Sequence, residues 1–550
     1  MSTLPAPGTS APPFELAGSD ERPLPFPGES SEPATLLLFV KHDCATCSLI
    51  APLVGRLYNT LERHGLRTIT VSQSDVAETR GFVERAGLTT PTVFDTDLDV
   101  SDRYGFDAVP ALVLTRPDGQ VVAGFEGWDK ADWNALVTQA IATCDAADVD
   151  TSALDAASTP LPESRPGCGS RAHDPDIARR LAVKRDSERL AGRRIRIPVA
   201  DDPFEFLAGE GLTDGLPVVP PTEDRVLRML KGTSRAATDV VAVVPPNLEP
   251  ATVEKVAINA VMAGCRPEYL PVVIAALTAA CTDTFNLHGV LATTYFVGPM
   301  VVVNGPIRQE IGLNCGRNVF GQGSRPNMTI GRALQLIVRN VGGGRPDGID
   351  MSTLGQPGKI GCCIGEDEEA SCWDPLHVER GFAPSDSTVT VFAGEAPRAI
   401  RDQLSRSARS LATSMGHALE SVAHVKLHGM GEVILVVSPE HVRTLERDGF
   451  SKADLRARIQ EVTARPLRDL VPDAECEKGT VPRGLPPAWL GPDGQPTPDA
   501  LDRRLPKFNR PEDIIVVVAG GTTGKFSAVV GGWASGGKSS SAVTRKIEDA

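Results

Sequence analysis

The chain has 550 residues, enough at about 150 residues per domain for three or four compact units or for two larger ones. Hydrophobic residues make up 41% of it and charged residues 23%, close to the globular average, so wholesale disorder is excluded. Lys and Arg number 56 against 70 Asp and Glu, a net charge of −14, and no basic cluster is interleaved with aromatic residues. We therefore expect no binding to nucleic acid.

Membrane insertion and secretion are not expected either. The longest apolar stretch, residues 270–281, is shorter than the roughly 20 residues that cross a bilayer. The opening MSTLPAPGTSAPPFEL lacks the basic and apolar regions of a secretory signal. We expect a cytoplasmic protein without membrane partners.

Cysteine is the most informative residue type. Eleven cysteines in a chain of this length do not form the disulfide framework of a small secreted protein, so most should be thiols. The ordinary interpretation of any one of them is a small buried apolar residue. Close pairs and clusters depart from it, and two occur: Cys44 with Cys47, and four cysteines between residues 315 and 372.

Residues 34–57 have the order strand, CxxC, helix. The run ATLLLFV at Ala34–Val40 predicts a buried strand, and apolar residues follow Cys47 at helical spacing. Cys44 is thus expected at the first turn of a helix, where backbone N–H groups and the helix dipole favour a thiolate and lower its pKa. Cys47 lies one turn on, on the same side, within reach of a disulfide with Cys44.

The next elements alternate in type. We predict strands at 68–71, Thr92–Phe94, 108–114 and 121–124, and helices at Val76–Ala86 and 98–104. The turn Pro117-Asp118-Gly119 joins the last two strands as a hairpin.

Residues 8–144 resemble the thioredoxin superfamily, in its TlpA-like or peroxiredoxin-like branch. The opening GTSAPPF at 8–14, the strand–CxxC–helix order and Val109-Pro110 carry the resemblance. It implies a thioredoxin fold with a redox-active dithiol that needs no cofactor. Cys44 would attack, Cys47 would resolve, and Pro110 would be a cis-proline beside them.

Two positions depart from that family's pattern. Asp43 stands where a Trp usually precedes the first cysteine, and Ala45-Thr46 replace Gly-Pro inside the motif. We expect the Asp43 carboxylate to oppose thiolate formation. A fold that only binds partners is the alternative for this domain.

Residues 145–194 are polar and rich in Pro, Ser and Asp, a composition typical of a flexible linker. Cys168 lies within it between Arg165 and Arg171, whose charges should lower the pKa of the thiol. We hypothesise that Cys168 shuttles electrons from Cys44 and Cys47 to a second site. An incidental exposed cysteine is the alternative.

Residues 195–550 are predicted to form a larger α/β domain that carries the catalytic site. The pattern of its apolar residues predicts strands at Val240–Val244 and Ile514–Val518 and a helix at Val253–Ala263. Two stretches share the order Leu-His-Gly, apolar strand, proline near a helix start, with strands at 299–303 and 432–437. This similarity suggests an internal βα duplication.

The densest chemistry of this domain combines thiols with acids. The four acids at 366–369 directly follow Cys362 and Cys363, and Cys315 and Cys372 lie in flanking loops. In a thiol site, one of these sulfurs would receive electrons while Glu366 or Glu369 moves protons. Vicinal Cys362 and Cys363 should point to opposite faces of a strand, and we favour Cys363 or Cys315 as receiver. The acids alone are typical of a solvated surface.

A metal site is the second interpretation of the same residues. Thiolates such as Cys372, together with His288 or His377, could bind a soft ion such as Zn²⁺, Cu⁺ or Hg²⁺. A metal-dependent lyase or hydrolase, whose thioredoxin domain keeps its thiols reduced, is then the alternative function.

Residues 205–540 resemble an uncharacterised bacterial family that we associate with thioredoxin-containing or selenocysteine-containing proteins. The cues are GLTDGLP at 211–217, EKVAINA at 254–260 and LHVERGF at 376–382. The resemblance implies sulfur or selenium chemistry and assigns no reaction.

The sequence as a whole predicts a thiol-disulfide oxidoreductase fusion. The CxxC domain would draw on a cellular thiol reductant and supply electrons to the C-terminal domain. That domain would reduce a small molecule or cleave a carbon–heteroatom bond, either as a single chain or as a homo-oligomer. A scaffold or chaperone without catalysis is the third reading.

Overall fold

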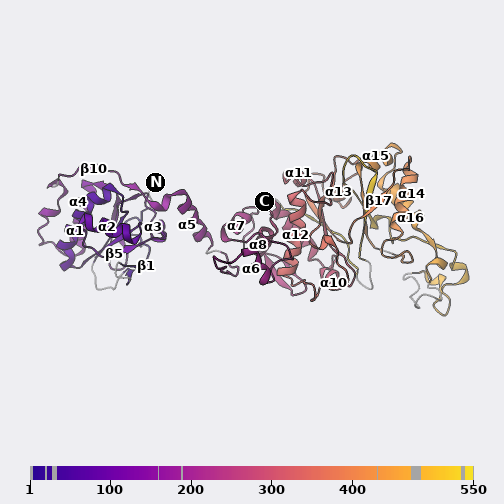
Figure 1. Ribbon diagram of the computed structural model, residues 1–550, viewed down its shortest axis with the longest axis horizontal. Helices are drawn as coiled ribbons and strands as arrows, with labels where there is room; N and C mark the ends of the chain where they lie inside the picture. Colours follow the sequence, from indigo (N-terminus) through magenta and orange to yellow (C-terminus); the bar gives the residue numbers. More distant parts are fainter. Residues whose placement is uncertain are drawn as a thin grey trace. The chain divides into compact units, whose positions relative to one another are not determined.

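The computed structural model describes residues 4–18, 22–27, 34–158, 160–187, 190–429, 431–471, 485–533 and 539–548. The chain divides into two compact units, Met1–Glu188 and Arg189–Ala550 (Figure 1). Cys476 lies outside the described residues.

The first unit is built on a five-stranded mixed sheet in the order β5-β4-β3-β7-β8. The strands are β3 (Ala34–Val40), β4 (Leu66–Ser72), β5 (Thr92–Phe94), β7 (Ala111–Thr115) and β8 (Val121–Glu126). The helices are α1 (Ala45–Leu61), α2 (Val76–Ala86), α3 (Asp99–Tyr104) and α4 (Lys130–Thr143). Smaller strands are β1 (Phe14–Ala17), β2 (Pro23–Phe26), β6 (Ala108–Val109) and β9 (Trp128–Asp129).

The central strand explains why the motif lies where it does. All seven residues of β3 are buried, as expected for a strand covered on both faces. β3 is parallel to β4 and antiparallel to β7, so its carboxyl end delivers the chain directly into Cys44 and α1. The predicted thioredoxin fold and its order of elements are confirmed.

The predicted linker differs from the structure over most of its length. Residues 145–187 belong to the first unit, which extends to residue 188. They include β10 (Ser164–Arg165), β11 (Cys168–Gly169) and α5 (Pro175–Ser187). β10 pairs with β9 and β11 pairs with β6, both antiparallel. The polar composition is compatible with order here because backbone hydrogen bonds join the segment to neighbouring strands and a few apolar side chains, such as Leu154 and Leu181, are buried.

The second unit contains two four-stranded sheets. One has the order β15-β14-β16-β23 and the other β17-β22-β18-β21. Their strands are β14 (Gly298–Asn304), β15 (Cys363–Gly365), β16 (Thr388–Gly394), β17 (Arg398–Arg401), β18 (Val433–Val437), β21 (Ile514–Val518), β22 (Phe526–Gly531) and β23 (Val543–Lys546). The sheets face each other through an apolar layer that includes Val302 of β14 and Val436 of β18.

Helices cover the outer face of each sheet, which gives four layers. The first sheet packs on α8 (Val253–Ala263), α9 (Leu270–Ala280) and α12 (Arg325–Asn340), and the second on α14 (Ala408–Leu419), α15 (Pro439–Arg447) and α16 (Lys452–Thr463). Figure 1 shows α8 and α12 on one side of this unit and α14 and α16 on the other. The remaining elements are α6 (Pro203–Gly209), α7 (Glu223–Leu230), β12 (Val240–Val244), β13 (Glu249–Thr252), α10 (Leu287–Ala292), α11 (Ile307–Glu310), α13 (Leu376–Glu379), β19 (Arg465–Pro466) and β20 (Arg504–Leu505).

The two sheets share one topology. β14 is parallel to β15 and antiparallel to β16, and β18 is parallel to β21 and antiparallel to β22. An antiparallel strand, β23 or β17, completes each sheet beside β16 or β22. The strands of the two Leu-His-Gly stretches therefore occupy equivalent positions, as the suggested duplication requires. Among the described helices, none combines the length and the apolar composition needed to span a bilayer.

Candidate functional site

Cys44 is the N-cap residue of α1. Its extended backbone, with φ −86° and ψ 114°, directs the sulfur at the free N–H groups of the first turn. Sγ accepts a hydrogen bond from the backbone N–H of Cys47 at 3.3 Å. In its thiol form it donates to the carbonyl of Val109 at 3.3 Å, and the Val109–Pro110 peptide is cis. Cys44, Cys47 and Pro110 thus meet as predicted.

The two cysteines of the motif differ in acidity. Hydrogen bonds from Cys47, and a further one with Cys168, lower the pKa of Cys44 to about 5 against the opposing effect of burial. Burial, followed by the interaction with Cys44, raises the pKa of Cys47 well above its usual value. Cys44 is therefore the thiolate at neutral pH, and Cys47 keeps its proton.

The opposing effect expected of Asp43 does not prevent this thiolate. The Asp43 side chain is exposed and lies 3.8 Å from the Lys41 ammonium. Solvent screening and this neighbouring cation weaken its effect on Cys44, and the hydrogen bonds to the sulfur outweigh it.

Cys168 lies at the same site, which its position in the sequence did not reveal. The pairing of β11 with β6 sets Cys168 opposite Val109, whose carbonyl lies 3.3 Å from Cys44 Sγ, so the thiols of Cys168 and Cys44 interact. The interaction with Cys44 is the largest cause that raises the pKa of Cys168, and burial is the second. The predicted lowering of this pKa by Arg165 and Arg171 is therefore wrong. The Arg171 guanidinium instead donates to the Gln73 carbonyl at 2.9 Å. The first unit therefore holds three thiols in one place.

The vicinal cysteines of the second unit point to opposite faces, as predicted. Cys363 lies in the core under the helices, and Cys362 borders the layer between the sheets. Burial raises the pKa of Cys362 to about 12 and that of Cys363 well above its usual value. The preference for Cys363 as a reactive thiol is therefore corrected.

Cys315, in the second unit, has an arginine beside its sulfur. It is partly exposed, and the Arg308 guanidinium donates to its Sγ at 3.7 Å. Burial still raises its pKa, and Arg308 opposes that rise. Arg308 also pairs with Glu368 at 3.0 Å and Glu369 at 3.1 Å. The acidic run is thus partly an ion-pair network rather than a solvated surface.

Glu366 holds the two sheets together. Its carboxylate accepts from Asn304 Nδ2 at 2.6 Å, from the Leu376 N–H at 2.8 Å and from the Val518 N–H at 3.4 Å. It is fully buried, which raises its pKa. These contacts assign it a structural role and leave its proposed proton transfer without an open path to solvent.

The candidate metal ligands are not brought together. His377 is fully buried, whereas His288 and Cys372 are exposed. Across the part of the chain that the structure describes, no three or more His, Cys, Asp or Glu residues are grouped so that they could hold a metal ion. The donor set proposed from the sequence does not fit a metal.

One cavity of the second unit has two unpaired hydrogen-bond donors in its wall. It measures about 340 Å³ and lies between α12 and the loop at 350–360. Gln335 Nε2 and Arg339 Nε are buried in its wall and make no hydrogen bond, and Lys359 pairs with Asp350 at 2.8 Å on the other side. Two unpaired donors suit an acceptor-bearing ligand.

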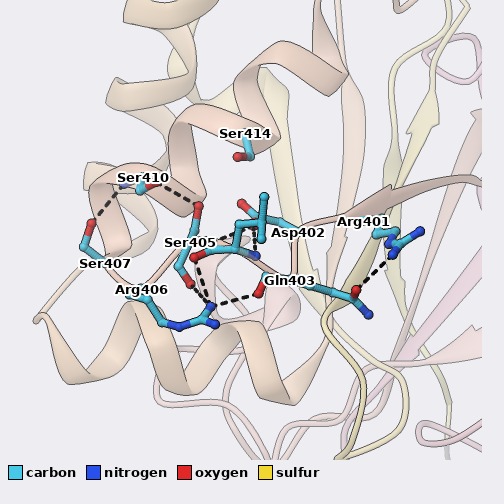
Figure 2. Close-up of a pocket in the computed structure, with 9 residues that line it drawn as sticks. Arg401, Asp402, Gln403, Ser405, Arg406, Ser407, Ser410 and Ser414 are labelled. Atoms are coloured by element: carbon cyan, nitrogen blue, oxygen red, sulfur yellow. Dashed lines mark hydrogen bonds between the residues drawn. The ribbon is translucent and has the colours of Figure 1, made fainter.

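A larger cavity of about 810 Å³ lies between the loop before α14 and the first turns of that helix. Arg401, Arg406 and several serines form its wall. Figure 2 shows that the Arg406 guanidinium turns back to its own loop, where it donates to the carbonyls of Gln403, Leu404 and Ser405 at 2.8–3.2 Å. Asp402 caps the same loop by accepting from the N–H groups of Leu404 and Ser405. These groups stabilise the loop and leave little free charge for a ligand.

Comparisons with known proteins agree with the first unit's geometry. Residues 7–123 match the model of the AhpC/TSA family. Thiol-disulfide oxidoreductase ResA of Halalkalibacterium halodurans is 32% identical over 80 residues, 14% of this chain and 46% of that protein. ResA of Geobacillus thermodenitrificans is 28% identical over 123 residues, 22% of this chain and 68% of that protein. The chain thus spans about half the length of the first relative.

A solved structure is also similar. The crystal structure of a thiol:disulfide interchange protein DsbE from Chlorobium tepidum aligns with 26% of this chain and 99% of its own, at 21% identity and a TM-score of 0.24. The N-terminal part of the chain has a thioredoxin fold and is similar in sequence to thiol-disulfide oxidoreductases.

Proposed function

We propose that this protein catalyses thiol–disulfide exchange with Cys44 as nucleophile and Cys47 as resolving thiol. The observation that carries the proposal is the placement of Cys44 at the N-cap of α1, where hydrogen bonds lower its pKa to about 5. A thiolate attacks disulfides, whereas a thiol does not.

The exchange balances in two steps. The Cys44 thiolate attacks one sulfur of a substrate disulfide, which forms a mixed disulfide and releases the other sulfur as a thiolate. The Cys47 sulfur then attacks Cys44 Sγ, which closes the Cys44–Cys47 disulfide and releases the second substrate thiol. A cellular thiol reductant would return the pair to the dithiol, and a reducing compartment such as the cytoplasm would supply it.

The finer proposal concerns the second unit as electron acceptor. Cys315 is its best-suited sulfur, since it is partly exposed and next to the Arg308 guanidinium. It would accept electrons when it is held in a mixed disulfide with a substrate thiol: the Cys44 thiolate attacks Cys315 Sγ and the substrate leaves as a thiolate. Cys47 then attacks Cys44 Sγ and releases Cys315 as a thiol. The cavity between α12 and the loop at 350–360, whose unpaired donors Gln335 and Arg339 suit an acceptor group, is a separate candidate binding site, since Cys315 is not part of its lining. No metal is required by this scheme.

Replacing each motif cysteine tests the exchange reaction. We expect Cys44→Ser to abolish reduction of a model disulfide such as insulin, because the only lowered thiol pKa among the described cysteines is lost. In Cys47→Ser/Cys168→Ser, where neither neighbouring thiol can resolve the adduct, Cys44 should still attack and should accumulate the mixed disulfide, identified by mass spectrometry of the tryptic peptides. The partner peptide names the acceptor, and a peptide containing Cys315 would support the second unit.

Cys144→Ser is the matched control. Burial raises the pKa of this first-unit cysteine to about 11, so its loss should leave the rate unchanged. Full reductase activity in Cys44→Ser would contradict the proposal and favour a fold that only binds partners.

A further inference from the structure

Residues 162–171, here called the covering segment, are fixed along the rim of the CxxC motif. Trp128 Nε1 donates to the Pro162 carbonyl at 2.7 Å, and the Lys130 N–H donates to the Glu163 carbonyl at 2.9 Å. At the other end the Ser170 N–H donates to the Asp107 carbonyl at 2.9 Å. Both ends of the segment are therefore attached to the fold by backbone groups.

The middle of the covering segment approaches the motif more closely than a side chain would allow. A Cβ placed on Gly167 would lie 2.7 Å from the Val109 carbonyl oxygen and 2.8 Å from Ala108 Cβ. The neighbouring Pro166 carbonyl accepts from Thr46 Oγ1, inside the CxxC, at 2.9 Å. Glycine at 167 is what lets the segment lie against the strand before Pro110.

In this arrangement the three cysteines differ in their exposure to solvent. Cys44 is 1% exposed and Cys47 is fully buried, whereas Cys168 is only half-buried. Cys168 is paired with Val109, whose carbonyl lies 3.3 Å from Cys44 Sγ. A molecule from solvent therefore meets the sulfur of Cys168 before it can meet that of Cys44.

We propose that Cys168 is a third redox cysteine of this site, which forms a disulfide with Cys44 and is the sulfur at which external thiols and disulfides exchange. The inference rests on the proposed exchange activity. Starting from the Cys44–Cys47 disulfide, the Cys168 sulfur attacks Cys44 Sγ. The Cys44–Cys168 bond forms, the Cys44–Cys47 bond breaks, and the proton of Cys168 passes to Cys47. The step is an isomerisation and consumes no oxidant.

The direction of attack by an external thiol follows from the acidity of Cys44. The thiol attacks Cys168 Sγ, forms a mixed disulfide with it and expels Cys44 as a thiolate. Cys44 is the better leaving group of the pair, because its pKa is lowered while that of Cys168 is raised. A second external thiol then releases Cys168 and leaves as a disulfide with the first.

Disulfide mapping in the full-length Cys47→Ser protein tests the bond. With oxidised glutathione we expect an internal Cys44–Cys168 disulfide and two released glutathione thiols, detected as one cross-linked peptide pair. In Cys47→Ser/Cys168→Ser, the reaction of Cys44 with oxidised glutathione should slow about tenfold or more, because Cys44 is then reached only by opening of the segment. A dominant Cys44–glutathione adduct formed at the same rate with and without Cys168 would overturn the proposal.

Two glycine substitutions test the covering segment in the Cys168→Ser background. Gly167→Ala should raise the rate of Cys44 alkylation by iodoacetamide about tenfold, because the added methyl group overpacks against Val109. Gly169→Ala is the matched control: a Cβ there meets nothing within 4 Å, and the rate should not change. Equal rates in the two variants would show that the segment does not restrict access to Cys44.

The tests separate this inference from the proposed function. If wild-type protein fails to reduce insulin while the Cys44–Cys168 disulfide forms, the proposed activity is wrong, and the proposal that Cys168 is a redox cysteine is supported. If wild-type protein reduces insulin and Cys168 stays a free thiol in oxidised Cys47→Ser, the proposed redox role of Cys168 is wrong and the proposed activity is supported.

Discussion

The ultraviolet absorbance of cysteine thiolate should titrate with a midpoint near pH 5 in the reduced protein. The pKa of Cys44 is lowered from 9.0 to about 5, whereas every other shift among the described cysteines is upward. At pH 7 the thiolate fraction of Cys44 would then be about 99%, compared with about 1% at the ordinary pKa, roughly a hundredfold change in reactive species. The measurement is absorbance near 240 nm against pH.

Two variants assign the step. Cys44→Ser should remove this titration step. Its loss would also show that the step does not come from Cys476, which lies outside the described residues. Cys47→Ala should move it towards higher pH, because hydrogen bonding from Cys47 is the largest cause of the lowered pKa. A midpoint that stays near pH 5 in Cys47→Ala would contradict the geometry of the pair.

The same pKa makes the stability of the reduced first unit depend on pH. A group whose pKa is lower in the folded state binds more protons when unfolded, so its stabilisation is present above pH 9 and declines as the pH falls to about 5. The Cys44–Cys47 disulfide has no such group. The melting temperature of the reduced form should therefore fall over that range more steeply than that of the oxidised form.

The elements that surround the motif could be predicted because local signals mark them. The helix at Val76–Ala86 has the predicted bounds, since Asp75 caps its start and Gly87 adopts the left-handed conformation that ends it. The opposite directions of Cys362 and Cys363 follow from the alternation of a strand. Each of these predictions depends on neighbours in the sequence.

The location of Cys168 depends on neighbours in space. Its strand pairs with β6 about sixty residues earlier, through backbone groups that every residue carries. The polar stretch around it therefore shows no apolar period that could be recognised. The preference for Cys363 failed for a related reason: which face of β15 is covered depends on helices and a second sheet distant in the sequence.

Replacing Arg308 by alanine should lower the free energy of unfolding of the second unit by about 3–5 kcal/mol, the usual cost of breaking a buried ion pair. The side chain is 4% exposed and pairs with Glu368, which is itself 15% exposed. It also donates to the carbonyl oxygens of Glu366 at 2.6 Å and Gly305 at 3.0 Å. Its loss leaves the Glu368 carboxylate without its cation, although Asn304 Nδ2 and the Gly305 N–H still donate to it. It also removes the guanidinium donor of both carbonyls. Denaturant unfolding of the full chain measures the change.

The charge of Glu368 accounts for much of this expected loss, so Glu368→Gln in the Arg308→Ala background should recover part of it. Arg317→Ala, an exposed arginine in the nearby loop, is the control and should change stability by less than about 0.5 kcal/mol. Arg308→Ala should also slow alkylation of Cys315, because the guanidinium that opposes the rise in its pKa is gone. Unchanged stability together with unchanged Cys315 reactivity would show that Arg308 does not connect the acidic run to this thiol.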